Sequence, residues 1–362
     1  MKKRELLVFA GQSNMLGAAV YPPRTPVETK DSFEYLYRDV YLGCGEGRFR
    51  EAGFPCGEFL YCDPAKAYPD GVSPDVKSKL ADHRENIFFG ASMSNLKDEA
   101  EHSTNPFAIY SENNYIPSPS LAPWFAAEWE KRGHACAYAH IAKGAVSILH
   151  FCDDEMLRDY HRLLTEKCRA SNQPVPAPRE LTDMQRGAAN CFAQKAAAFL
   201  RDSEKQFPGE DLSTRCFVWL QGESDAAMDK DEYQTLLEVL WKKVQTLGFT
   251  HFLCIRVGLW GDPHIIEVIR AQEAFCACTP EAVMLTRACS LMPLARQPEG
   301  WFVQEPGEEY QFCRDSHYGF NNQHFNEKAF LLVARRAAEN MDRLLYRHEA
   351  PVLEDELLTG ML

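Results

Sequence analysis

The pattern of apolar runs constrains the fold of this chain more than any other sequence feature. Five short apolar runs are separated by longer segments with helical periodicity, which is typical of a parallel sheet with helices on both faces. The runs are Leu6–Ala10, Ala135–Ala142, Cys216–Leu220, Phe252–Val257 and Ala282–Thr286. The expected helices are Ser120–Lys131, Met184–Gln206, Asp231–Leu247, Pro263–Cys276 and Asn326 to about Arg347. The sequence therefore predicts an α/β fold with a five-stranded parallel sheet, whose reactive loops lie beyond the carboxyl ends of the strands.

A long segment after the first run does not follow this alternation. Residues 18–117 are rich in Tyr, Pro, Gly and charged residues and show no sustained period of 2 or 3.6. We expect an irregular insertion there that packs over the sheet or its active face. Residues 1–348 are then a single domain, and residues 349–362 form a peripheral tail.

Charge and cysteine usage exclude several classes of function. A net charge of −13 and the lack of a Lys/Arg cluster argue against nucleic acid and anionic membranes as partners. The 13 cysteines are odd in number and scattered, which predicts free thiols. The first apolar run is too short for a secretion signal, and no stretch is long enough to span a membrane, so the expected location is the cytoplasm. His134, His140 and His150 lack ligand spacing and no HExxH pattern occurs, so no metal and no cofactor is expected.

Chemically capable residues follow the ends of several predicted strands. Ser13 lies just after the first run, at a strand-to-helix turn that exposes a hydroxyl, although serine at such a place is more often a helix N-cap. Gly144 follows the second run, where backbone can approach a ligand closely, and Gln221 follows the third with a side-chain amide. His324 precedes the last predicted helix. Together they supply a nucleophile, a base and donors for an oxyanion.

Four short stretches resemble motifs of the SGNH hydrolase superfamily, in its branch of carbohydrate esterases such as sialate O-acetylesterases and acetylxylan or acetylmannan esterases. They are GQSNM at 11–15, KGAVSI at 143–148 (KGGTSI in the family), WLQGESD at 219–225 and HFNEKAF at 324–330. The resemblance spans residues 6 to about 338, with the insertion unmatched. It implies a three-layer α/β/α SGNH fold, which is flavodoxin-like.

The resemblance also implies roles for individual residues. Ser13 is the nucleophile and His324 the general base. The oxyanion hole consists of the Ser13 amide, the Gly144 amide and the Gln221 side chain. A family aspartate three residues before the histidine is replaced by Asn321, whose amide oxygen can still accept the Nδ1 proton.

Three alternatives remain open around the base. Glu223 and Asp225 could serve as its carboxylate, or else as hydrogen-bonding scaffold for their loop. Asp315 in RDSHYG lies close enough in sequence to act as a surrogate acid, or Asp315 and His317 are themselves the working pair. The remaining candidates are substrate-binding or scaffold residues: Gln12, Asn14, Lys143, Glu223 and Arg256. Arg256 is a candidate for binding a substrate carboxylate, or equally a structural ion-pair partner.

The expected function is that of a serine esterase that removes O-acetyl groups from carbohydrates through an acyl-enzyme intermediate. Its expected partner is a small acetylated sugar or oligosaccharide, either a sialic acid or a sugar of plant glycans. The replacement at Asn321 suggests an alternative, a catalytically impaired relative that binds glycans. A lipase-type or thioesterase-type SGNH hydrolase is a further alternative, although GQSNM and QGESD differ from the GDS and GxND motifs of the lipid-cleaving members.

Overall fold

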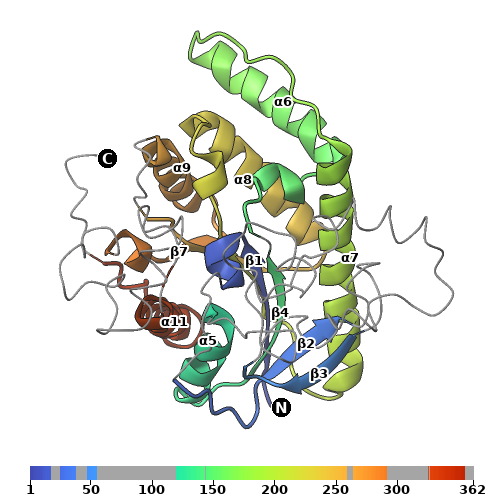
Figure 1. Cartoon of the computed structure of the whole chain (residues 1–362), viewed down its shortest axis with the longest axis vertical. Coiled ribbons are helices and arrows are strands. Elements are labelled where there is room, and N and C mark those ends of the chain that lie inside the picture. The colour runs from blue at the N-terminus through green and yellow to red at the C-terminus, as the bar shows by residue number, and fades with distance from the viewer. Residues whose placement is uncertain are drawn as a thin grey trace, which may run out of the picture.

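The computed structural model describes residues 1–17, 25–37, 47–54, 120–142, 144–258, 264–291, 325 and 327–354. Within them the chain forms an α/β fold around one sheet of seven strands, in the order β3-β2-β4-β1-β5-β6-β7 (Figure 1). The carboxyl end of β1 lies near the middle of this sheet, between those of β4 and β5.

The five expected strands form the parallel part of the sheet. They are β1 (Glu5–Gly11), β4 (Cys136–Ala142), β5 (Arg215–Leu220), β6 (His251–Ile255) and β7 (Ala282–Thr286). Each of these strands pairs in parallel with its neighbours in that part of the sheet. Every residue of β1 and β4 is buried, as continuous apolar runs require when helices cover both faces.

Two further strands extend the sheet and correct the expectation of a purely irregular insertion. β2 (Phe33–Tyr37) pairs in parallel with β4, and β3 (Gly47–Glu51) pairs antiparallel with β2, so the sheet is mixed and has seven strands, not five. Both segments are only five residues long and carry charges, such as Glu34 and Arg50, which form an ion pair at 2.6 Å. Five residues are too few for a period to stand out within residues 18–117, and the strands with which they pair, β4 for β2 and β2 for β3, decide their structure.

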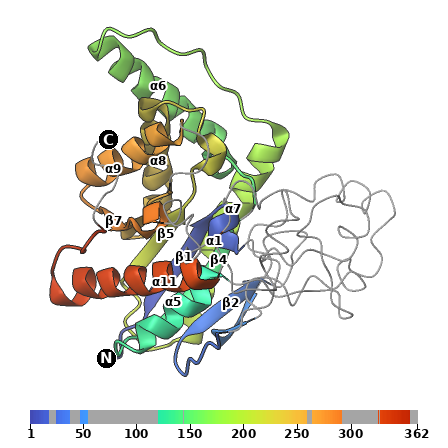
Figure 2. The ribbon, with the colours of Figure 1, turned by 60° about the vertical axis from the view of Figure 1, so that its left-hand side comes forward.

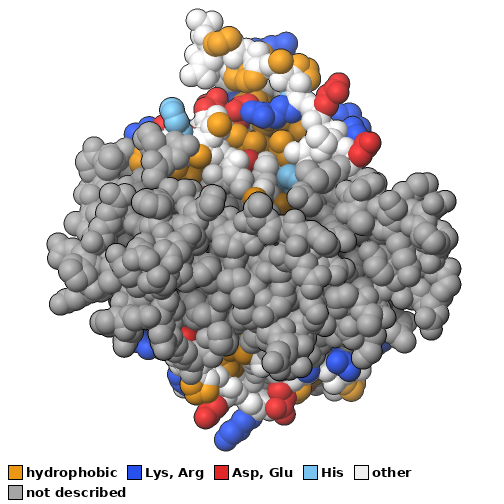
Figure 3. Space-filling view, viewed as in Figure 1, with side chains coloured by type: hydrophobic (Ala, Val, Ile, Leu, Met, Phe, Trp, Pro, Cys, Tyr) orange, Lys and Arg blue, Asp and Glu red, His pale blue; other side chains and the backbone are white. Residues whose placement is uncertain are grey.

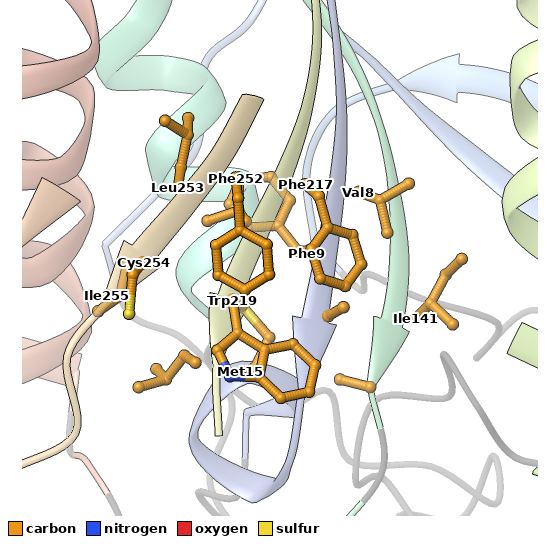
Figure 4. Close-up of a cluster of buried hydrophobic side chains, with 14 of the residues drawn as sticks. Val8, Phe9, Met15, Ile141, Phe217, Trp219, Phe252, Leu253, Cys254 and Ile255 are labelled. Atoms are coloured by element: carbon orange, nitrogen blue, oxygen red, sulfur yellow. The ribbon is translucent and has the colours of Figure 1, made fainter. Parts of the chain in front are cut away.

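Helices cover both faces of the sheet (Figure 2). α5 (Leu121–Glu130) and α11 (Glu327–Asp342) pack on one face, where Phe9 of β1 meets Phe125 with ring centroids 5.4 Å apart. α7 (Asp183–Gln206), α8 (Lys230–Thr246) and α9 (Ile265–Cys278) lie on the other. There Phe217 contacts Phe192 of α7, while Phe252 contacts both Trp241 of α8 and Phe275 of α9. Figure 4 shows part of the core that these side chains build.

One long helix was absent from the sequence prediction. α6 (Asp154–Ala170) packs against α8 and extends to one end of the molecule (Figure 1). Its N-cap is Asp153, whose side chain accepts from Met156 N at 2.9 Å. The buried side chains recur at a helical spacing that could have revealed it: Met156, Leu157, Tyr160, Leu164 and Cys168.

Shorter elements complete the description. α1 (Ser13–Leu16) follows β1, η2 (Ile148–Phe151) follows β4, η3 (Glu223–Asp225) follows β5, η4 (Ala288–Leu291) follows β7, and the π-helical turn η6 (Arg343–Arg347) extends α11. Several of the connections that carry candidate residues thus begin at the carboxyl ends of neighbouring parallel strands.

The described surface carries mixed charges, and the described cysteines are unpaired. In the view of Figure 3, side chains of both charges lie interspersed over the described residues, with no concentration of Lys and Arg among them. All described cysteines are free thiols, and most are buried. Across the described part of the chain, every helix is too short or too polar to cross a lipid bilayer.

Candidate active site

Ser13 lies where the buried strand β1 passes directly into a short helix. β1 ends at Gly11 and α1 begins at Ser13, so a single residue separates strand from helix. The first turn closes on the Gln12 carbonyl, which accepts from Met15 N at 2.9 Å and from Leu16 N at 2.8 Å. Ser13 is 7% exposed, and none of the described residues hydrogen-bonds its hydroxyl. The hydroxyl therefore occupies the strand-end position that a nucleophile in an open α/β sheet requires.

The short helix is fixed from the neighbouring strand by a histidine. His140 of β4 is buried, and its Nε2 lies 2.7 Å from the carbonyl oxygen of Met15. Because a carbonyl oxygen only accepts, Nε2 must carry a proton. Burial lowers the pKa of His140 to about 4, so the ring is neutral at pH 7. No sequence pattern indicates this role, which depends on the pairing of β1 with β4.

The side chains on either side of Ser13 are both tied to the loop that follows β5. Gln12 Oε1 accepts from Ser224 N and from Gln221 Nε2, each at 3.2 Å. Asn14 Nδ2 donates to Glu223 Oε1 at 2.8 Å. Gln12 and Asn14 were predicted as substrate-binding or scaffold residues, and these contacts favour the scaffold role for both. The turn thereby holds Ser13 between two anchored neighbours.

Gln221 is more deeply placed than an oxyanion donor needs to be. Its side chain is fully buried, and Nε2 also lies 2.6 Å from Asp225 Oδ2 and 3.0 Å from Val146 O. Its Oε1 accepts from the Tyr233 hydroxyl at 2.7 Å. An amide nitrogen has two hydrogens, so donation to a substrate oxygen would require one of these bonds to be exchanged. The oxyanion role of Gln221 stays a prediction, and its observed bonds join the loops after β4 and β5.

Asp225 is the centre of that junction. Its carboxylate accepts from the backbone N of Ile148 at 2.7 Å as well as from Gln221. Burial raises the pKa of Asp225, while its hydrogen bonds act in the opposite direction. Asp225 thus links the β5 loop to the segment that follows Gly144.

Gly144 opens the turn after β4 and is followed by a residue in an unusual conformation. Ala145 has a φ of 56°, in the left-handed region that glycine adopts most readily. The motif that KGAVSI resembles has glycine at this position, and the backbone here retains the conformation that suits it. The contribution of the Gly144 amide to an oxyanion hole stays a prediction.

Arg256 has a structural environment. Its side chain is fully buried, forms an ion pair with Glu273 and donates to Ser290 Oγ at 2.7 Å. Glu273 also pairs with Arg287 at 2.8 Å. Of the two roles considered for Arg256, these contacts favour the structural ion pair and disfavour the binding of a substrate carboxylate.

Several predicted site residues lie outside the described residues. They are Lys143, Asp315, His317, Asn321 and His324. The described residue nearest in sequence to the candidate base is Phe325, whose backbone N donates to Asn14 Oδ1 at 3.2 Å. The chain therefore returns, after more than 300 residues, to the residue that follows Ser13.

The buried carboxyl group of Glu223 gives a testable dependence of stability on pH. Burial raises the pKa of Glu223 above its ordinary value of 4.5, and the nearby Asp225 carboxylate acts in the same direction. Its Oε2 has no hydrogen-bond partner among the described residues. Because the folded state binds this proton more tightly than the unfolded state, the contribution to stability is complete below about pH 4.5 and is lost as the pH rises through the folded-state pKa.

Replacing Glu223 by glutamine removes this titration. We expect the free energy of unfolding of Glu223→Gln to rise relative to that of the wild type as the pH increases from 4 through the folded-state pKa of Glu223, so that the variant becomes relatively more stable. Urea unfolding of both proteins across this range measures the difference. A difference that stays constant with pH would show that Glu223 has the same pKa in the folded and unfolded states.

Comparison with known proteins gives a shared fold. No protein-family model matches the chain, and no curated protein matches it. The structure is similar to the crystal structure of NanS, with a TM-score of 0.50 and 13% identity over 96% of this chain and 99% of that one. A protein from Arabidopsis thaliana matches with a TM-score of 0.47 and 12% identity, over 93% of this chain and 97% of that one. A carbohydrate acetylesterase from Xanthomonas citri matches with a TM-score of 0.42 and 11% identity, over 96% of this chain and 57% of that one. At this identity the likeness to NanS shows the fold alone.

Proposed function

We propose that the chain is a serine esterase that removes O-acetyl groups from carbohydrates. One observation carries the proposal: Ser13 lies at the carboxyl end of β1 with a hydroxyl that no described residue hydrogen-bonds, while the side chains of both its neighbours are tied to the QGESD loop. A serine that served only as a helix cap would be expected to bond a backbone N–H of its own turn. The GQSNM and QGESD motifs and the fold shared with NanS support the same proposal.

The proposed reaction has two steps. Ser13 Oγ attacks the acetyl carbonyl as His324 takes its proton, and the resulting oxyanion is stabilised by the Ser13 and Gly144 amides, with Gln221 as a further candidate donor. Collapse of this intermediate breaks the ester bond, and the imidazolium returns the proton to the departing sugar hydroxyl. Water then attacks the acetyl-serine with the same base, which releases acetate and restores Ser13.

The proposed base is supported by its neighbour in the chain. Phe325, the residue that follows His324 in the sequence, donates its backbone N–H to Asn14 Oδ1 in the serine turn. Asn321 is the proposed acceptor for the Nδ1 proton. Asp315 remains the alternative acid, and Asp315 with His317 the alternative pair.

Acetate release tests the proposal directly. Purified protein is incubated with p-nitrophenyl acetate, 9-O-acetyl sialic acid, acetylxylan and acetylated mannan oligosaccharides, and the product is quantified. Turnover of at least one sugar ester is expected. Binding of the deacetylated sugars without any turnover would instead favour the impaired glycan-binding relative suggested by Asn321.

The pH profile tests the identity of the base. An imidazole that must accept a proton predicts a kcat/KM that falls about tenfold per pH unit below its pKa, near 6.5 for an unperturbed histidine. The profile is measured with p-nitrophenyl acetate between pH 5 and pH 8. A rate that does not change over this range would contradict a histidine base.

A further inference from the structure

The side chain of Asn14 bridges two segments that are far apart in the chain. On one side its Nδ2 donates to Glu223 Oε1 at 2.8 Å, and on the other its Oδ1 accepts from Phe325 N at 3.2 Å. Asn14 is 1% exposed, so water does not compete for these bonds. We call the three residues Asn14, Glu223 and Phe325 the amide bridge.

The chemistry of the bridge fixes its direction. Phe325 contributes a backbone N–H, which can only donate, so the oxygen end of the Asn14 amide must face it. The nitrogen end then faces Glu223, whose carboxylate oxygen can only accept. Each contact therefore prevents the amide from flipping, and the Glu223 carboxyl sets the orientation in which Asn14 can receive the Phe325 backbone.

The position of the bridge connects the nucleophile to the start of the C-terminal helix. Asn14 belongs to the same turn as Ser13, and Phe325 directly follows the candidate base in the sequence. Glu223 opens η3, on the loop whose Ser224 N also anchors Gln12.

We infer that Asn14 and Glu223 are positioning residues that hold the backbone at Phe325, the residue after the candidate base, against the turn of Ser13. The catalytic part of this inference rests on the proposed function. The anchoring part concerns a hydrogen bond and can be measured without any turnover.

The inference is tested by placing the carboxylate at position 14 and the amide at position 223, which should restore the activity lost in the single variant Asn14→Asp. In Asn14→Asp a carboxylate oxygen faces Glu223, so the two acidic groups repel each other. We expect kcat to fall at least tenfold with KM changed less than threefold, because the base is misplaced while the substrate still binds. In the double variant Asn14→Asp with Glu223→Gln, the glutamine amide donates to the new carboxylate, and we expect kcat to return to within about threefold of the wild-type value.

Asn340 provides a matched control. It is also a buried bridging asparagine, with Nδ2 donating to Leu285 O at 2.8 Å and Oδ1 accepting from Val352 N at 2.8 Å. It lies near the far end of α11 from Phe325, about 20 Å away at 1.5 Å per helical residue. Asn340→Asp is expected to lower the unfolding temperature without changing kcat.

Amide hydrogen exchange separates the bridge from the catalytic proposal. In Asn14→Ala the acceptor of Phe325 N is removed, and exchange in peptides containing that amide is expected to become at least tenfold faster, whereas Asn340→Asp leaves it unchanged. If exchange becomes faster in Asn14→Ala while the wild-type protein hydrolyses no ester, the bridge is supported and the proposed function is overturned. Unchanged exchange in Asn14→Ala, or a double variant as slow as Asn14→Asp, would overturn the inference. If Asn14→Ala does not fold, the rescue experiment alone decides.

Discussion

Replacing Ser13 by alanine is expected to lower kcat/KM for acetyl ester hydrolysis by between about 10³- and 10⁶-fold while leaving the fold unchanged. The nucleophile supplies the bond-forming oxygen, and binding or oxyanion stabilisation alone leaves only a residual rate. The hydroxyl makes no hydrogen bond to the described residues, so its removal breaks no described contact. Hydrolysis of p-nitrophenyl acetate and thermal unfolding of the same preparation measure the two effects.

Ser224 offers the control for this variant. It lies on the adjacent β5 loop, is exposed, and contributes only its backbone N to the hydrogen bond with Gln12. Ser224→Ala should therefore retain wild-type turnover. If Ser13→Ala and Ser224→Ala were equally active, the acyl-enzyme proposal would be wrong, whatever the sugar specificity.

Replacing Gly11 by alanine is expected to destabilise the protein by at least about 3 kcal/mol. Gly11 has a φ of 155°, which side chains rarely adopt, and an added Cβ would lie only 1.9 Å from the carbonyl oxygen of Leu220. That oxygen is backbone of the paired strand β5 and also accepts from Gln12 N at 3.2 Å, so it cannot move without disturbing the turn at Ser13. Urea unfolding gives the free-energy difference, and activity should fall with it.

Gly133 is the control that separates the cost of the Cβ clash at Gly11 from the cost of a positive φ. Its φ of 85° is also unfavourable for alanine, but an added Cβ would meet no heavy atom within 4 Å. Gly133→Ala is expected to cost only about 1 kcal/mol. Equal losses in the two variants would mean that β1 and β5 can separate freely at Gly11, in conflict with their close approach in the structure.

Local patterning was sufficient for most of the fold. The segments of β1, β4, β5, β6 and β7 are apolar enough to require burial on both faces. The helices between them show the 3.6-residue period of apolar side chains. The segments of β2 and β3 are short, and their structure depends on pairing, of β2 with the edge of β4 and of β3 with β2. α6 is different, because its buried side chains recur at a helical spacing that is visible in the sequence itself.

The candidate site likewise has a part that the sequence indicated and a part that only the structure shows. The strand-end rule and the motifs indicated Ser13 and the QGESD loop, since the carboxyl ends of neighbouring parallel strands must meet at one edge. The spacing of residues did not indicate that the Gln221 amide donates to Asp225 or that Arg256 pairs with Glu273. It also did not indicate that His140 hydrogen-bonds the turn of Ser13.

The sequence by itself determined the five parallel strands, the helices between them and the loops at the reactive edge, because those properties follow from residues close together in the chain. Only the tertiary structure decided which polar atoms are joined, as in the bridge from Asn14 to Glu223 and Phe325. A hydrogen bond requires its donor and acceptor to be placed to within a few tenths of an ångström, and between groups hundreds of residues apart this placement is set by packing.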